Sequence, residues 1–296
     1  MLDLILENVN TMARKHHILT LFLLIAIVNV HAASRFDYWR SDSLKVTLLL
    51  QEANRMDANT NWMLHFARKL CGLPYVAQTL EKNTEEKLVI NLRQMDCTTY
   101  AETVTALTLC IRQGLPTFKN YCHNLQQIRY INGEVSYPKR LHYFTLWVEE
   151  NKKKGLIECI EEPKVVFSSV QTVNANYMST HPSRYPMLRN NPEWIPQIKA
   201  MEDAITGRHY SYIPKEKLKN TQTLRQVIHN GDIVVILTSK LGLDTSHLGI
   251  AVWHKNGLHL LNASSIHHRV VEEQKTFYQY MREHPSNIGI RVVRVK

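Results

Sequence analysis

The stretch from residue 88 to residue 114 constrains this chain most, because it predicts a strand, a turn and a long buried helix in succession. Residues 88–92 are apolar and strand-like, and Met95-Asp96 is a turn-prone pair. From Cys97 onward, apolar or small residues recur at three- and four-residue spacing until Gly114 ends the pattern. Cys97 is therefore expected in the first turn of a helix, where free N–H groups and the helix dipole lower the pKa of a thiol.

A low thiol pKa suits a nucleophile, because the thiolate is the attacking species. A single cysteine on a core helix is, however, more often part of the packing. The interpretation of Cys97 as a nucleophile therefore depends on finding a base elsewhere in the chain.

His247 is the candidate base, because it stands at the start of an apolar strand pattern and Asn262 lies on the next one. If residues 254–257 form the loop, Asn262 falls opposite Gly249 and shares a face with His247, about 7 Å away on the diagonal. The Asn262 oxygen would then accept the Nδ1–H of His247, leaving Nε2 toward the thiol. A two-residue turn at residues 256–257 would put the pair too far apart. Cysteine, histidine and a polar orienting residue together make the cysteine-protease constellation.

The remaining patterns predict an α+β fold, with helices in the first two thirds and a mostly antiparallel sheet in the last third. The expected helices span residues 43–56, 62–70, 97–114, 118–130, 141–154, 192–205 and 274–282. The expected strands span residues 88–92, 165–173, 232–238, 248–254, 258–263, 269–271 and 288–295. The segment 178–196, rich in Pro, Asn, Ser and His, is expected to be a long covering loop.

The N-terminus has the parts of a secretory signal peptide over residues 1–33. Arg14 and Lys15 precede an apolar run at residues 18–30, and Val30 and Ala32 supply the small residues of a cleavage site. We expect Met12 to be the natural start, with residues 1–11 an over-extension. We expect residues 34–296 to form a single catalytic domain with a helical insertion at about 115–205, exported to a bacterial periplasm as a soluble monomer without stable membrane insertion.

Composition limits the partners. The excess of Lys and Arg over Asp and Glu is +10, which favours anionic surroundings such as nucleic acid, a membrane face or an acidic wall polymer. The chain has no zinc-finger spacing and no basic run interleaved with aromatic residues, so nucleic acid is not an expected partner. It also lacks H-E-x-x-H and C-x-x-C motifs, so no metal or other cofactor is expected. The five cysteines could form two disulfides beside a free Cys97, in one of three pairings, or all be reduced.

Several motifs together resemble the NlpC-type cell-wall cysteine hydrolases, which have a papain-like core. They are PYVA at 74–77, MDCTT at 95–99, SHLGIA at 246–251 and NAS at 262–264. Thr98 stands where that superfamily usually has Ser, and Asn262 where it usually has His. A longer set resembles its N-acetylmuramoyl-L-alanine amidase-like branch over most of the mature chain. This set adds TLE at 79–81, RLHYF at 140–144, MSTHP at 178–182, YIP at 212–214, GDI at 231–233 and GLD at 242–244.

The resemblance implies cleavage of the amide between the lactyl group of N-acetylmuramic acid and L-alanine in peptidoglycan fragments, with a preference for 1,6-anhydro-muropeptides. It implies a nucleophile helix packed on the sheet, with Cys97, His247 and Asn262 as the catalytic residues. The candidates for stabilising the oxyanion or binding substrate are Tyr75, Asp96, Arg140, Tyr143, Trp147, His181, Asp244 and Ser246. Three alternatives stay open: a γ-D-glutamyl-diaminopimelate endopeptidase, a non-catalytic muropeptide-binding module, and an acyl- or transglutaminase-type transferase.

Overall fold

The computed structural model describes residues 35–296, so the predicted signal peptide lies outside the described residues. Residues from Tyr38 to Lys296 form one compact unit, and strand β1 (Phe36–Asp37) belongs to the unit that precedes it. No helix within residues 35–296 has the length and apolar character needed to cross a membrane.

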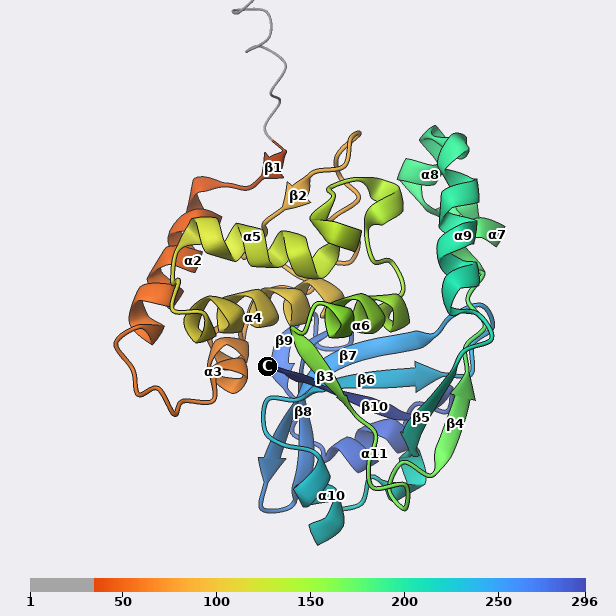
Figure 1. The fold of residues 1–296 in the computed structure, drawn as a ribbon. Coiled ribbons are helices and arrows are strands. Elements are labelled where there is room, and N and C mark those ends of the chain that lie inside the picture. The colour runs from red at the N-terminus through yellow and green to blue at the C-terminus, as the bar shows by residue number, and fades with distance from the viewer. Residues whose placement is uncertain (1–34) are drawn as a thin grey trace, which may run out of the picture. The chain divides into compact units, whose positions relative to one another are not determined.

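The helices concentrate in the first two thirds of the described chain, as predicted (Figure 1). The first group comprises α2 (Arg40–Ala53), α3 (Trp62–Lys69), α4 (Cys97–Arg112), α5 (Phe118–Arg129) and α6 (Phe144–Lys153), with the short strand β2 (Leu88–Val89) before α4. The later helices are α7 (Tyr177–Thr180), α8 (Pro186–Asn190), α9 (Ile195–Ile205), α10 (Gln222–Val227) and α11 (Phe277–Arg282).

An eight-stranded antiparallel sheet follows, in the order β4-β5-β10-β6-β7-β8-β9, with β3 also paired to β10. The strands are β3 (Ile157–Ile160), β4 (Ser169–Thr172), β5 (His209–Pro214), β6 (Ile233–Thr238), β7 (Thr245–His254), β8 (Gly257–Ser264), β9 (Arg269–Glu272) and β10 (Asn287–Val295). The α+β class and the mostly antiparallel sheet are confirmed.

The sheet separates two hydrophobic cores. On one face Leu248, Ile250 and Leu261 pack with the helices α2 to α6. On the other face Ala251 and Leu260 pack with α10 and α11. Because both faces are covered, β6 and β8 are buried along their whole length. β6 appears in the sequence as an apolar run, whereas β8 also buries the polar residues His259, Asn262 and Ser264.

Several boundaries differ from the predictions. Helix α2 begins at Arg40 rather than Ser43, because Asp42 accepts the Trp39 N–H at 2.9 Å and caps the helix earlier. The expected covering loop at 178–196 contains the short helices α7 and α8. Strands β3 and β5 and helix α10 were not predicted, since β3 and β5 lie in half-buried positions where polar residues weaken the hydrophobic pattern.

Helix α4 is fixed to α5 by a buried ion pair. Arg129 Nε lies 2.7 Å from Glu102 Oε2, and both side chains are almost fully buried. Arg129 Nη1 also donates to the carbonyl of Val89, at 2.7 Å. One guanidinium therefore links α5, α4 and the strand that leads into α4.

Removing one partner of this pair should destabilise the fold. Glu102→Ala leaves the Arg129 charge buried without its counter-ion, which costs on the order of 3–5 kcal/mol. Glu52→Ala breaks the exposed pair with Lys69 and should change the free energy of unfolding by less than about 1 kcal/mol. Urea unfolding of both variants checks this, and equal losses would contradict it.

Candidate active site

Cys97 is the first residue of α4, as predicted, because Asp96 caps that helix. Asp96 Oδ1 accepts the N–H of Thr99 at 2.8 Å, and the Thr99 hydroxyl accepts the N–H of Asp96 at 3.0 Å. This reciprocal capping box satisfies two backbone donors and fixes where the helix begins. The position of the thiol is thereby fixed as well.

Backbone pairing ties this segment to the C-terminal sheet. The 72–75 segment runs along the free edge of β9: the N–H of Gly72 and the carbonyl of Leu73 bond to Val270, and the N–H of Tyr75 bonds to the carbonyl of His268. On its other side Met95 exchanges two hydrogen bonds of 3.1 Å with this segment. The Pro-Tyr loop thus lies between the sheet and the residues that lead into Cys97.

The register predicted for β7 and β8 is confirmed. His254 pairs with Gly257 and Ile250 with Leu261, so Asn262 is level with Gly249. A Cβ on Gly249 would lie 2.4 Å from the Leu260 side chain and 3.1 Å from the carbonyl of Leu261. A glycine therefore lets the two strands approach closely beside His247.

His247 and Asn262 are in direct contact, but through the other ring nitrogen than predicted. Nε2 of His247 lies 2.8 Å from Oδ1 of Asn262, so the prediction that Asn262 accepts from Nδ1 is wrong. The diagonal neighbour is reached by the far end of the imidazole ring. Nδ1 is the ring nitrogen that does not contact Asn262.

The thiol of Cys97 lies beside the same part of β7. It accepts a backbone hydrogen bond from Leu248, the residue that follows His247, and further hydrogen bonds from Thr98. Residues far apart in the sequence, at the start of α4 and in β7 and β8, thereby meet at one end of the sheet.

The electrostatics of the thiol differ from the prediction. Burial and, to a lesser extent, the nearby Asp96 carboxylate raise the pKa of Cys97 to about 12, although the hydrogen bonds from Leu248 and Thr98 act in the opposite direction. The helix start alone therefore does not produce a low pKa. Burial also lowers the pKa of His247, while the hydrogen bond that His247 donates to Asn262 and the charge of Glu273 act in the opposite direction. Both groups are held in their neutral forms, a donor thiol and an acceptor imidazole.

Tyr75 lies near the thiol. Burial raises its pKa to about 12, and Cys97 and Asp96 add to the effect. The Tyr75 hydroxyl consequently remains a protonated donor at neutral pH.

Three of the predicted substrate-binding residues have buried side chains that contact other residues of the fold. The Arg140 guanidinium is buried, pairs with Glu81 and lies 3.4 Å from Glu86. The Tyr143 hydroxyl donates to Glu202 at 2.7 Å, and Trp147 is fully buried and stacked on Phe144.

The other three predicted residues shape their local surroundings. His181 is exposed and stacks on Tyr177 at a ring distance of 4.4 Å. Asp244 is buried and accepts the N–H of Thr145 at 2.6 Å, and Ser246 donates to Asn287 at 3.0 Å. Asp244 therefore joins the start of α6 to the turn that precedes β7.

Glu273 is a site residue that the sequence did not indicate. Its Oε1 accepts a hydrogen bond of 3.1 Å from Nδ2 of Asn262. The only signal is its position two residues beyond Val271, which pairs with Asn262, and that pairing is visible only once β8 and β9 are aligned.

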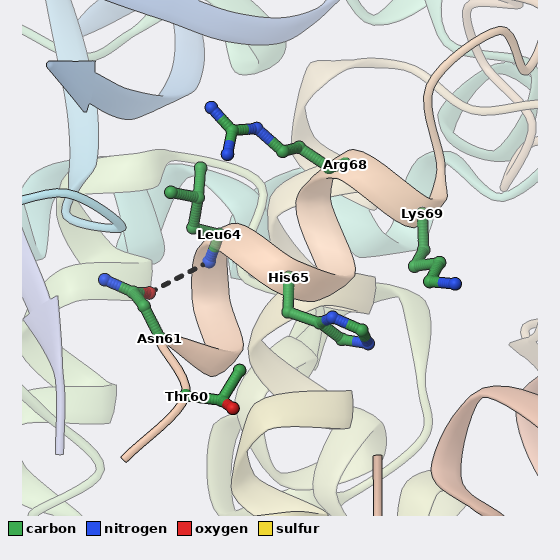
Figure 2. Close-up of a pocket in the computed structure, with 6 residues that line it drawn as sticks. All are labelled: Thr60, Asn61, Leu64, His65, Arg68 and Lys69. Carbon is green, nitrogen blue, oxygen red and sulfur yellow. Dashed lines mark hydrogen bonds between the residues drawn. The ribbon is translucent and has the colours of Figure 1, made fainter. Parts of the chain in front are cut away.

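One surface hollow lies beside α3, and none of the predicted site residues lines it. A hollow of about 510 Å³ beside α3 is lined by Thr60, Asn61, Leu64, His65, Arg68 and Lys69 (Figure 2). The side chain of Asn61 there accepts the N–H of Leu64 at 3.0 Å and so serves as the cap of α3.

All five cysteines are free thiols. Across residues 35–296 no three His, Cys, Asp or Glu side chains are grouped as they would be to hold a metal ion.

Comparisons with known proteins agree on one family. The model of the N-acetylmuramoyl-L-alanine amidase-like (AmiA-like) family matches residues 65–290. An N-acetylmuramoyl-L-alanine amidase from Bacteroides uniformis ATCC 8492 is 36% identical, with a TM-score of 0.74 over 79% of this chain and 98% of that protein. A Bacteroides fragilis protein named as a xylanase is 37% identical, with a TM-score of 0.73 over 78% of this chain and 100% of its own.

A Legionella pneumophila protein, 22% identical with a TM-score of 0.64, covers 86% of this chain and 94% of its own and shares the fold. A search of curated proteins found no match. The family match spans most of the chain and the Bacteroides structures are covered almost completely. The chain therefore belongs to the N-acetylmuramoyl-L-alanine amidase-like family.

Proposed function

We propose that this protein is a cysteine amidase that hydrolyses the amide between the lactyl group of N-acetylmuramic acid and L-alanine in peptidoglycan fragments. The observation that carries the proposal is the meeting of the partly buried Cys97 thiol with strand β7: Leu248 donates to Cys97, and the preceding His247 contacts Asn262 at 2.8 Å. The family match and the Bacteroides uniformis amidase support the substrate class. The motif resemblance supports a preference for 1,6-anhydro-muropeptides, and the signal-like N-terminus supports export.

The proposed reaction has two halves. Cys97 Sγ attacks the lactyl carbonyl carbon while its proton passes to Nδ1 of His247. The tetrahedral intermediate collapses as the imidazolium protonates the L-alanine nitrogen, so that the amine leaves and a thioester remains. His247 then takes a proton from water, the hydroxide attacks the thioester, and the thiol is regenerated with a free lactyl carboxylate.

Asn262 and Tyr75 would support these steps without changing covalently. Asn262 keeps Nε2 of His247 protonated and Nδ1 free to accept. Tyr75, neutral because burial raises its pKa to about 12, would donate to the oxyanion together with the backbone N–H of Cys97.

Replacing the nucleophile should abolish turnover but not binding. Cys97→Ala should lower kcat for a defined muropeptide by at least about 10³-fold while the substrate still binds, because binding does not need the thiol. Mass spectrometry of the digest checks the bond that is cut. Release of the sugar with an intact stem peptide supports the amidase, whereas a shortened stem would indicate the endopeptidase alternative.

The control for this variant is Cys71→Ala, which removes an exposed thiol. It should leave kcat unchanged. Equal turnover by Cys97→Ala and wild type would refute the cysteine mechanism.

The same digest separates the other candidate functions. A wild-type protein that binds the muropeptide without turnover would be a muropeptide-binding module, and one that forms product only with an added amine acceptor would be a transferase. Running 1,6-anhydro and reducing muropeptides side by side tests the sugar preference.

Removing the Tyr75 hydroxyl should raise the free energy of the transition state more than that of the bound substrate. Tyr75→Phe should lower kcat by about 10²-fold with little change in KM, because an oxyanion donor acts mainly on developing charge. Tyr278→Phe, a half-buried tyrosine on α11, is the matched control and should behave as wild type. Steady-state kinetics of the two variants checks this; a Tyr75→Phe enzyme within threefold of wild type would exclude Tyr75 as a donor.

The pH dependence follows from His247. Protonation removes the base, and because burial lowers the pKa of His247, activity should be retained below the ordinary histidine pKa of about 6.5 and be lost only as pH falls further. A profile of kcat/KM from acid to neutral pH measures this. An acid midpoint at or above about 6.5 would mean that His247, as buried here, is not the base.

A further inference from the structure

The orientation of the Asn262 side chain decides whether it can hold His247 correctly. An asparagine amide has an accepting oxygen at one end and a donating NH₂ at the other. Only the oxygen, Oδ1, can accept a hydrogen bond from Nε2–H of His247, and the distance from Oδ1 to Nε2 is 2.8 Å. A reversed amide would point a donor at Nε2, favour the other tautomer and place the proton on Nδ1, where the thiol proton must go.

The groups behind Asn262 leave a single favourable orientation. Nδ2 lies 3.1 Å from Oε1 of Glu273 and 3.4 Å from the carbonyl oxygen of Val271. A carboxylate and a carbonyl only accept hydrogen bonds. If the amide were reversed, its oxygen would face both of them without a donor, in a site where Asn262 is 1% exposed.

Glu273 is itself held in place from several directions. Its Oε2 lies 3.1 Å from Nε2 of His267, and the carboxylate is buried. Its backbone N–H donates to Leu260 at 2.9 Å, and its carbonyl accepts from Nδ1 of His259 at 2.8 Å. A buried carboxylate fixed in this way is a rigid support for the amide rather than a mobile surface group.

We infer that Glu273 is a positioning residue, which holds the Asn262 amide with its oxygen toward His247 and, through its negative charge, favours the imidazolium that forms during the reaction. The proposed relay is Cys97, His247, Asn262, Glu273 and His267. The inference deepens the proposed function and rests on it, because it assigns a role in the same reaction.

The charge around His247 comes from three elements. Asp96 lies at the start of α4, Glu273 follows β9, and His284 follows α11. The two carboxylates raise the pKa of His247 and His284 lowers it, while burial is the largest effect and lowers it. Around Glu273 the facing groups are Asn262, His267 and Tyr280.

The neighbouring glutamate provides a matched control. Glu272 has different partners: its carboxylate lies 3.0 Å from Nε of Arg68 and 2.6 Å from Nε2 of His254. Glu272→Gln and Glu273→Gln therefore remove the same charge one residue apart. Glutamine at 273 can still accept from Asn262 and donate to His267, so that variant separates the charge from the hydrogen bonds.

The experiment combines kinetics on the muropeptide with alkylation of Cys97 by iodoacetamide, followed by peptide mass spectrometry in the full-length protein. Glu273→Ala should lower kcat about 10²-fold with KM nearly unchanged, and should slow alkylation of Cys97. Glu273→Gln should recover most of kcat but shift the acid midpoint of kcat/KM to lower pH. Glu272→Gln should match wild type in every measurement.

The outcomes separate the two claims. If Glu273→Gln keeps the wild-type acid midpoint and a folded Glu273→Ala keeps wild-type kcat, the inference is overturned while the amidase proposal stands. If Glu273→Ala does not fold, an unshifted acid midpoint in Glu273→Gln alone overturns it. If the Glu273 variants slow alkylation of Cys97 but the wild-type protein releases no sugar, the amidase proposal is refuted and the positioning role of Glu273 stands.

Discussion

The backbone ladder through residues 72–76 is the constraint on which the site depends. This segment bonds to Val270 and His268 of the sheet on one side and to Met95 on the other. Cys97 follows Met95 by two residues, and Asp96 caps the helix between them. Because main-chain hydrogen bonds have fixed lengths and directions, the thiol is placed against β7 by the backbone and not by the packing of flexible side chains.

The proposed nucleophile Cys97 and the proposed base His247 are both partly buried, and burial favours the neutral form of each. It raises the pKa of Cys97 and lowers that of His247. A helix start contributes only partial charges, which burial and the Asp96 carboxylate outweigh here. In the proposed reaction, proton transfer from the Cys97 thiol to the imidazole would therefore depend on the groups that hold His247 as much as on the start of α4.

Much of the architecture was predictable from periodicity and turn residues. The start of α4 at Cys97 and the antiparallel sheet follow from local patterns, because a helix cap and strand alternation are determined within a few residues. The sequence left two turns open for the β7–β8 hairpin, and the structure has the register that brings Asn262 level with Gly249. The half-buried strands β3 and β5 were missed, since their polar residues face neighbours that come from elsewhere in the chain. For the same reason Arg140 could not be assigned: its carboxylate partners lie about sixty residues away.

By itself the sequence determined which residue types take part, the helix that carries Cys97 and the strand that carries His247, because propensity, capping and side-chain alternation are local. The tertiary structure alone decided which imidazole nitrogen contacts Asn262, that Arg140, Tyr143 and Trp147 turn inward, and that Glu273 contacts Asn262 from the other end of its amide. Those outcomes depend on burial and on contacts between distant strands, and both exist only after the sheet has formed and excluded water.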